Sequence, residues 1–492
     1  MSRQEHLPPN FGRLDSALRS IGYSFESAVA DIVDNSLDAG ALDIRVRFLQ
    51  ASNQPLDLVV WDGGRGMDAA TLQEAMRFGA DLSQEMTRLG KFGLGLKLAS
   101  LSQAKALHVY TWRDGGLHGR GWLEKGISDG FSNTIFTDTE CAQAVNALSH
   151  AFPQCKSGTL VHWSHLNRIK RRNENSTELV QHLLKRLNNH LGITFHRFIK
   201  RPTDPATIHL DILDLDSGEV GLPKVVEALD PFGYKRSGDP AFPASMTPEE
   251  ECPLTIRAHI WSPNSDLKEY RLPGGANSRQ GFYFYRNNRL VQAGGWNGIR
   301  EAEPHSSLAR LEVDVGPELD LDFSLDVKKS EIRLPPHLAF AIERSRTANG
   351  IDFKKYLGLA KKAYSSRQRM HGDLPLIPSD GMPARLRDVL KEELRITGVR
   401  KTRDLRFEWT ELPDDRFFDL DRDNDVLYLN QAFRRQLLHG LKGSSADLPV
   451  VKSLLFLLLR DSFHLERVGS KAREHLDQIN RILIEAVKCE RR

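Results

Sequence analysis

Cysteine is scarce in this chain, and long apolar runs are missing. Its four cysteines include no Cys-x-x-Cys pair, so they favour neither a disulfide framework nor a zinc knuckle and fit a reducing cytosol. The longest apolar run, Leu454 to Leu459, is too short to span a bilayer and predicts a buried helix. The N-terminal stretch MSRQEHLPPNFGRLDSALRS lacks the apolar core of a signal peptide. We therefore expect a cytoplasmic protein without a membrane partner.

A strong charge of one sign is also absent. The chain carries 68 Lys and Arg against 65 Asp and Glu, a formal net charge of +3. A balance this even excludes a protein that binds phosphate over its whole surface, so any nucleic-acid contact would be local. At 492 residues the chain has room for roughly two to four domains and a sizeable core.

Three regions differ in their sequence pattern. Residues 1–200 mix helical stretches with short strands and hold clusters of glycine, whereas residues 201–350 are dominated by strand-like runs between Pro, Gly and Asn turns. Residues 351–492 begin with a basic helical stretch and a Pro- and Gly-rich linker at 371–383, and are otherwise mostly helical. We predict three domains with these bounds and an α+β fold. The strand-like runs of the middle region are 207–212, 255–261, 281–291 and 311–315.

The first informative motif is the stretch from Glu26 to Ala41. It predicts one helix, because it contains no proline and Gly40 stands near its end. Asp31, Asn35 and Asp38 fall within roughly 60° around that helix and form one polar stripe. An oxygen-rich stripe suits Mg²⁺, which commonly takes one or two protein oxygens and completes its shell with water and substrate phosphates. The alternative is the solvated face of an amphipathic helix.

The second motif, LVVWDGGRGM at residues 58–67, predicts a strand that ends in a tight turn. Asp62 stands at the strand end, where its carboxylate can accept a hydrogen bond from an exocyclic amine such as adenine N6. Gly64 and Gly66 stand where a side chain would block close approach. Asp-Gly is also an ordinary turn signal, and that alternative stays open.

The third motif is LGKFGLGLKLAS at residues 89–100. Its glycines open directly into a helical pattern and offer free backbone N–H groups to phosphate at a helix N-terminus. No strand immediately precedes them, which argues against a dinucleotide-binding fold, and their spacing is not that of a P-loop. The polar stretch before them, residues 78–88, suits a lid that orders when a ligand binds.

In this order and spacing, the three motifs resemble those of the GHKL ATPase superfamily, which includes gyrase ATPase subunits, MutL, ninety-kilodalton heat-shock chaperones, sensor histidine kinases and MORC proteins. A fourth stretch, KSGTLVHW at residues 156–163, resembles the Gly-Thr strand of that family. The resemblance covers roughly residues 20 to 165. It implies an α/β sandwich of the GHKL (Bergerat) type that binds ATP and Mg²⁺.

The resemblance also implies roles for individual residues. It assigns Asn35 as the Mg²⁺ ligand, Asp62 as the adenine-binding carboxylate and Thr159 as the residue that completes the adenine site. Asp31 stands where relatives such as MutL hold a glutamate as general base; it is one methylene shorter and would act directly, through a water, or poorly. Lys97 is assigned either to phosphate or to the surface of its helix. The remaining nucleotide-binding candidates are Asp38, Gly64, Gly66, Met67, Gly90, Lys91, Phe92, Gly93, Leu94 and Gly95.

Two segments of the middle region extend the resemblance. GFYFYRNNRLV at residues 281–291 resembles the strand-turn-strand element in the transducer domain of MutL and gyrase, and more closely that of MORC proteins. DVKKSEIR at residues 326–333 resembles the MutL segment whose lysine reaches the γ-phosphate. Lys329 aligns with that lysine and is the catalytic candidate beside Asp31. Lys328 is the fallback, and an exposed basic turn is the alternative interpretation.

The MORC-like resemblance implies a slow Mg²⁺-dependent ATPase that forms a homodimer on binding ATP. It would act as a nucleotide-gated clamp on DNA or on a DNA-associated protein partner, in phage defence or DNA surveillance. The basic residues of 168–172 and 354–369 suit contact with phosphates, and they equally suit solvated helix faces. Two alternatives stay open: a chaperone-like ATPase acting on protein clients, and an ATP-gated scaffold without hydrolysis.

Overall fold

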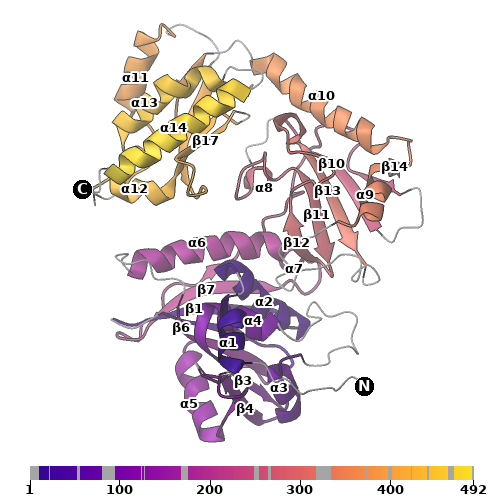
Figure 1. Ribbon diagram of the computed structural model, residues 1–492, viewed down its shortest axis with the longest axis vertical. Helices are drawn as coiled ribbons and strands as arrows, with labels where there is room; N and C mark the ends of the chain where they lie inside the picture. Colours follow the sequence, from indigo (N-terminus) through magenta and orange to yellow (C-terminus); the bar gives the residue numbers. More distant parts are fainter. Residues whose placement is uncertain are drawn as a thin grey trace, which may run out of the picture.

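The protein has three domains, each with a large hydrophobic core of its own, in the computed structural model (Figure 1). The second and third domains lie side by side above the first in this view, and helix α6 (Ser176–Thr194) runs along the upper side of the first domain. The structure describes residues 10–20, 23–52, 56–79, 95–123, 125–126, 128–167, 176–248, 254–263, 267–316, 334–371, 375–396, 402–422, 424–439, 441, 443–463 and 470–489.

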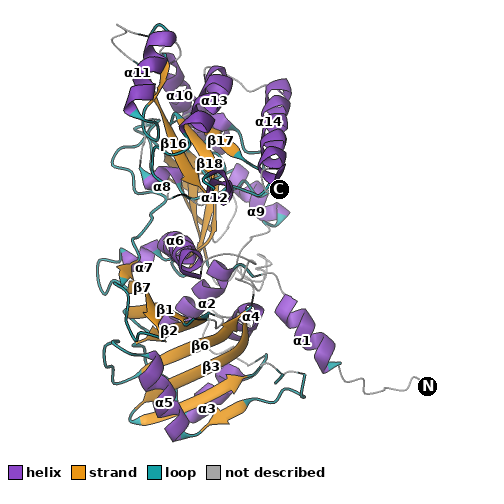
Figure 2. Cartoon of the chain, turned by 90° about the vertical axis from the view of Figure 1, so that its left-hand side faces the viewer, coloured by secondary structure: helices purple, strands orange, loops and turns teal. Residues whose placement is uncertain are grey.

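The first domain is an α/β sandwich. Its strands are β1 (Asp43–Gln50), β2 (Asp57–Asp62), β3 (Ala104–Arg113), β4 (Gly116–Trp122), β5 (Thr134–Phe136), β6 (Gly158–Leu166), β7 (Thr207–Asp214) and β8 (Lys224–Val225). Its other helices are α1 (Phe11–Ser20), α2 (Phe25–Asp38), α3 (Ala69–Met76), α4 (Gly95–Gln103), α5 (Asp138–Leu148) and α7 (His196–Ile199). The eight strands form one sheet in the order β5-β4-β3-β6-β2-β1-β7-β8. Helices α2, α4 and α6 cover one face of this sheet and α5 covers the other (Figure 2).

The first domain extends beyond residue 200, so the predicted boundary there is too early. Strand β7 pairs in parallel with β1 along its whole length, and β8 pairs with β7. Arg47 on β1 and Asp211 on β7 form a buried two-pronged ion pair, with N–O distances of 2.7 and 2.8 Å. The run 207–212 is a strand, as predicted, but hydropathy does not reveal which sheet a strand joins when its partner is distant in sequence.

The second domain is built on a six-stranded sheet in the order β12-β11-β13-β10-β9-β14. Its strands are β9 (Ala244–Thr247), β10 (Leu254–Ile260), β11 (Gly281–Arg286), β12 (Arg289–Ala293), β13 (Ala309–Val315) and β14 (Arg346–Thr347), and its helices are α8 (Lys268–Arg271), α9 (Pro336–Glu343) and α10 (Phe353–His371), with a 3₁₀ turn at Pro304–Ser306. The predicted strands at 255–261, 281–291 and 311–315 are confirmed.

Helix α10 belongs to the core of the second domain, so the predicted boundary at residue 350 is also too early. Its side chains at Phe353, Tyr356 and Ala360 are buried against the sheet. The Tyr356 hydroxyl lies 2.9 Å from the carbonyl oxygen of His259 and donates a hydrogen bond to it. The helix is found as predicted, but its many charged residues make the apolar side that joins it to the preceding domain hard to recognise in the sequence.

The third domain combines helices with a sheet that the sequence analysis did not find. Helices are the larger part, as predicted: α11 (Ala384–Glu393), α12 (Gln431–Leu437), α13 (Pro449–Leu459) and α14 (Ser470–Cys489), with a 3₁₀ turn at Arg460–Phe463. The strands β15 (Leu376–Pro378), β16 (Arg403–Thr410), β17 (Phe418–Asp421) and β18 (Val426–Asn430) form a sheet in the order β15-β16-β18-β17. Strand β15 lies inside the predicted linker, where proline and glycine concealed a short edge strand.

Helix α13 is only half buried, contrary to the prediction for its apolar run. Leu455, Phe456 and Leu459 pack into the core of the third domain. Leu454 is 62% exposed and Leu458 is 52% exposed. Among the described helices, none is both long enough and apolar enough to cross a membrane.

We expect Asp211→Asn to lower the free energy of unfolding of the first domain by about 3 kcal/mol, because Arg47 would remain as a buried cation without its carboxylate. Chemical denaturation of the whole protein measures this loss. The control is Asp114→Asn, which removes an exposed pair with Arg113 at 3.1 Å, away from β7, and should cost about 1 kcal/mol or less. Equal losses for the two variants would contradict a structural role for β7 in the first sheet.

Candidate functional site

Helix α2 carries the first group of predicted site residues. Its N-terminus is capped by Ser24, whose hydroxyl accepts a hydrogen bond from the Ser27 N–H at 3.1 Å. Its apolar side packs on the sheet and is buried in the core of the first domain. The predicted stripe is therefore unevenly buried: Asp31 is 3% exposed, Asn35 is exposed, and Asp38 is half-buried.

Asp62 lies at the end of β2, held from two sides. Its Oδ2 atom accepts a hydrogen bond from the Ser36 hydroxyl at 2.9 Å, and its Oδ1 atom accepts one from the Gly64 N–H at 2.9 Å. Thr159 stands directly opposite Asp62 in the pairing of β2 with β6. Burial raises the pKa of Asp62 to about 6, although the hydrogen bonds from Gly64 and Ser36 oppose the shift. The structure thus brings together the two residues predicted to recognise adenine.

The turn after Asp62 requires glycine. Gly66 has a φ of +64°, and a Cβ atom there would lie 2.2 Å from the carbonyl oxygen of Trp112. A Cβ atom at Gly64 would lie 2.8 Å from that of Ala39. No side chain fits at either position, so the backbone approaches its neighbours closely, as the motif predicts.

Thr111 connects this turn to β6 and was missed by the sequence analysis. Its hydroxyl accepts a hydrogen bond from the Met67 N–H at 2.8 Å and donates one to the Gly158 carbonyl at 2.9 Å. It also lies 3.4 Å from the Thr159 hydroxyl. Thr111 sits within the strand-like run ALHVYTW, which carries no glycine or acidic residue to mark it as part of a site. Ser36 was missed as well, although it stands inside the first motif.

The N-terminus of α4 lies beside α2. A Cβ atom at Gly95, the first residue of α4, would lie 3.9 Å from Oδ2 of Asp31. The last glycine of the third motif is therefore next to the predicted general base. The other members of that motif, Gly90, Lys91, Phe92, Gly93 and Leu94, lie outside the described residues, as do Lys328 and Lys329.

Lys97 on α4 is buried, so its predicted alternative place on the helix surface is wrong. Its side chain is 1% exposed, and its Nζ atom donates a hydrogen bond to the Ala75 carbonyl of α3 at 2.8 Å. Desolvation lowers the pKa of Lys97 to about 8. In this conformation the lysine ties α4 to the last turn of α3. Its contact with phosphate stays a prediction.

Arg289 is a further residue of the site that the sequence did not indicate, although it lies within the segment 281–291. It opens β12 in the second domain, directly after Asn287 and Asn288, whose φ angles are 46° and 65°. Its guanidinium reaches α2, where Nη2 donates a hydrogen bond to Oδ1 of Asp31 at 3.1 Å and Nη1 donates one to Oδ2 of Asp34. The basic turn RNNR was recognised as a transducer element, but nothing local in it indicates a buried partner.

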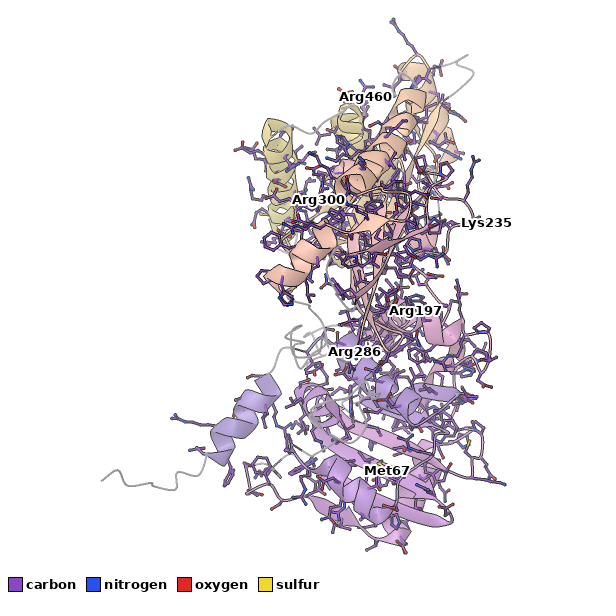
Figure 3. All side chains as sticks on the ribbon, turned by 90° about the vertical axis from the view of Figure 1, so that its right-hand side faces the viewer. Met67, Arg197, Lys235, Arg286, Arg300 and Arg460 are labelled. Atoms are coloured by element: carbon purple, nitrogen blue, oxygen red, sulfur yellow. The ribbon has the colours of Figure 1, made fainter. Side chains whose placement is uncertain are left out.

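A second set of contacts joins the first two domains near Arg197 and Arg286, which lie at their junction (Figure 3). The guanidinium of Arg197 on α7 lies 2.6 Å from Oε1 of Glu312 and 2.5 Å from Oδ1 of Asp314, both on β13. It also lies over the ring of Tyr285 at 3.5 Å from the centroid. These contacts lie away from Met67 and the turn after Asp62, which are inside the first domain.

Replacing Gly66 by alanine tests the close approach in the turn. Gly79 provides a matched control, since its φ of +70° is nearly the same but no atom of the described residues lies within 4 Å of a Cβ atom there. We expect Gly79→Ala to cost about 1 kcal/mol in backbone strain. Gly66→Ala should cost about 2 kcal/mol more, because the Trp112 carbonyl must move. Chemical denaturation measures both, and equal losses would show that the carbonyl does not limit this position.

Comparison with known proteins agrees with this geometry. Residues 23–151 match the family described as histidine kinase-, DNA gyrase B-, and HSP90-like ATPase. Over 89 residues the chain is 34% identical to the ATPase morc-1 of Caenorhabditis elegans, a match that covers 18% of this chain and 10% of that protein. Over 105 residues it is 31% identical to the DNA mismatch repair protein MutL of Chlamydia trachomatis serovar L2, covering 20% of this chain and 18% of that protein.

Each of these two relatives is matched over less than a fifth of its own length. The family match ends at residue 151, inside the first domain. Within the matched segment lie Asp31, Asn35, Asp62 and Gly66, the residues that carry the predicted nucleotide site. The resemblance read from the motifs is thus confirmed for the first domain. Residues 23–151 match the ATPase family to which the motifs are similar, the GHKL ATPase superfamily.

Proposed function

We propose that this protein binds ATP with Mg²⁺ in its first domain, hydrolyses it slowly, and uses nucleotide-dependent homodimerisation to close on DNA or a DNA-associated protein partner. The observation that carries the proposal is the placement of Asp62 and Asp31. Asp62 lies at a glycine turn beside Thr159, and the side chain of Asp31 on α2 lies next to the first residue of α4. In this proposal adenine binds at the end of β2 and the phosphates bind at the start of α4.

Recognition of adenine rests on the carboxylate of Asp62. When ionised, Asp62 accepts hydrogen bonds only, which suits the exocyclic amine of adenine. Ser36 and Gly64 hold it in place, each through a hydrogen bond of 2.9 Å. The absence of a side chain at Gly66 lets the base approach the backbone closely.

Hydrolysis would take place between α2 and the start of α4. The first N–H groups of a helix have no partner within the helix, and together with its dipole they favour phosphate. Oδ2 of Asp31 faces this end of α4, where the carboxylate can orient a water and accept its proton. Asn35 lies one turn further along α2 with an exposed amide, which suits one protein oxygen in a Mg²⁺ shell. When bound, Mg²⁺ would neutralise negative charge on the phosphates.

Contact with DNA is supported by the exposed lysines of α10. Lys354, Lys355 and Lys362 are exposed on this helix, on the side away from its buried aromatic residues. MutL, one of the relatives, is a DNA mismatch repair protein. In this proposal Lys329 senses the γ-phosphate and links nucleotide state to the position of the second domain. A cytoplasmic role in phage defence or DNA surveillance follows from the MORC-like resemblance.

Two substitutions separate binding from hydrolysis. Asp62→Asn should weaken binding of a non-hydrolysable ATP analogue about tenfold or more, because the amide cannot replace a charged acceptor. Asp31→Asn should leave that affinity unchanged and lower ATP turnover about a hundredfold, the lower end of what a positioned base contributes. Calorimetric titration and a phosphate-release assay measure the two effects. Equal turnover by wild type and Asp31→Asn would remove Asp31 from the mechanism.

The pH dependence of binding provides a control for Asp62. Its pKa of about 6 means that the carboxylate becomes protonated as the pH falls through 6, and a protonated carboxyl group is a poorer acceptor for the adenine amine. We therefore expect analogue affinity to weaken over this range in wild type. The same titration of Asp62→Asn corrects for protonation of the analogue's own phosphates. If the affinities of wild type and Asp62→Asn change with pH in parallel, Asp62 does not recognise adenine.

The clamp is tested by sizing the protein with and without the analogue and with and without DNA. We expect a monomer alone, a dimer with the analogue, and tighter DNA binding by the dimer that weakens as salt rises. The triple variant Lys354→Glu, Lys355→Glu, Lys362→Glu should dimerise normally and bind DNA less tightly. A monomer under every condition would contradict the clamp, and dimerisation without DNA affinity would favour action on protein clients.

A further inference from the structure

Two carboxylates of α2 meet one arginine of the second domain. Asp31 and Asp34 are 3% and 1% exposed, and Arg289 is 3% exposed. The guanidinium contacts both carboxylates, through Nη2 to Asp31 at 3.1 Å and through Nη1 to Asp34. The two aspartates stand three residues apart and therefore share one side of the helix.

The burial of these groups distinguishes this contact from an ordinary surface ion pair. Taking a carboxylate out of water carries a large desolvation penalty, which an opposite charge at hydrogen-bonding distance offsets. The carboxylates of Asp31 and Asp34 raise the pKa of Arg289 against the effect of its own burial. The guanidinium is thus fully charged and held between the domains.

The two oxygens of Asp31 face different neighbours. Oδ1 accepts the hydrogen bond from Arg289, whereas Oδ2 lies 3.9 Å from the position that a Cβ atom would take on Gly95. We propose that Arg289 is a positioning residue for ATP hydrolysis: it holds Asp31 through Oδ1 and so turns Oδ2 toward the phosphate-binding end of α4. This inference rests on the ATPase function proposed above.

The backbone around Arg289 suits such a role. Asn287 and Asn288 adopt the left-handed conformation that a tight two-residue hairpin requires, which fixes the direction in which Arg289 leaves the turn. Strand β12 also packs against α6, which in turn packs on α2. Arg289 therefore projects from a strand that packs against the first domain, and it contacts Asp31 only while the second domain is docked on the first.

Arginine also suits the short side chain of Asp31. Aspartate reaches one methylene less far than the glutamate that relatives such as MutL place here, so its carboxylate depends more on an outside contact for its direction. A guanidinium is planar and presents several N–H donors in a fixed fork, whereas an ammonium group is a freely rotating point charge. Arg289 can therefore orient two carboxylates at once, which lysine cannot do equally well.

Kinetics of Arg289→Met and Arg289→Lys test the inference. We expect Arg289→Met to lower kcat about tenfold or more while the affinity for a non-hydrolysable ATP analogue stays within about twofold, because Arg289 acts on the base and not on the nucleotide. Arg289→Lys should recover part of the lost rate. In the Asp31→Asn background, Arg289→Met should cause no further loss, because the two residues act as one unit.

Arg197→Met is the matched control. Arg197 also joins the first two domains through carboxylates, those of Glu312 and Asp314, but lies away from Asp31. We expect this variant to keep kcat within about threefold of wild type. Equal losses for Arg197→Met and Arg289→Met would overturn the inference and leave a purely structural interface. The inference would also be overturned if Arg289→Met lowered kcat by the same factor in the Asp31→Asn background as in wild type.

The outcomes separate this inference from the proposed function. Failure of the wild-type protein to bind the analogue or to release phosphate would refute the ATPase function itself. If the wild-type protein turns over ATP and Arg289→Met keeps the wild-type kcat, only the positioning role is refuted. Analogue binding and the thermal unfolding midpoint establish that each variant is folded. If Arg289→Met does not fold, Arg289→Lys carries the test, and wild-type kcat in that variant would overturn the inference.

Discussion

The charges of α2 impose the main constraint on the first two domains. This helix lies against the sheet and carries three buried carboxylates, those of Glu26, Asp31 and Asp34. Each must find a cation outside the helix, because a buried charge without a partner is costly. Arg186 of α6 supplies one at 2.6 Å from Glu26, and Arg289 of the second domain supplies the other. The helix therefore assembles correctly only with α6 and the second domain in place.

The turn after Asp62 imposes a different constraint, because it holds a carboxylate whose charged form is destabilised by burial. Asp62 is almost fully buried and held by two hydrogen bonds, yet burial still raises its pKa to about 6. At neutral pH its ionised form is thus less stable in the folded protein than in the unfolded chain. A ligand that donates a hydrogen bond to this carboxylate would relieve part of that penalty. Such uncompensated groups are characteristic of binding sites.

Local signals in the sequence predicted much of the site. A strand ending in Asp62, a turn that needs glycine at residue 66 and a capped helix over α2 all have short-range causes, and all are found in the structure. The role of Arg289 could not be predicted from such local signals, because its partners are separated from it by more than 250 positions. The sheet partner of β7 and the edge strand β15 were missed likewise, because pairing with a distant strand leaves no periodic pattern.

Helix α10 extends from the second domain toward the third and can transmit a rotation of one to the other. It is packed in the core of the second domain from Phe353 to Tyr364, and its far end leads toward the third domain (Figure 1). It has 19 residues. At about 1.5 Å per residue, a helix of this length spans roughly 28 Å, so a turn of about 10° at its base would swing its tip by about 5 Å. A small rotation of the second domain, of the kind that releases or engages Arg289, would therefore be magnified into a displacement of the third.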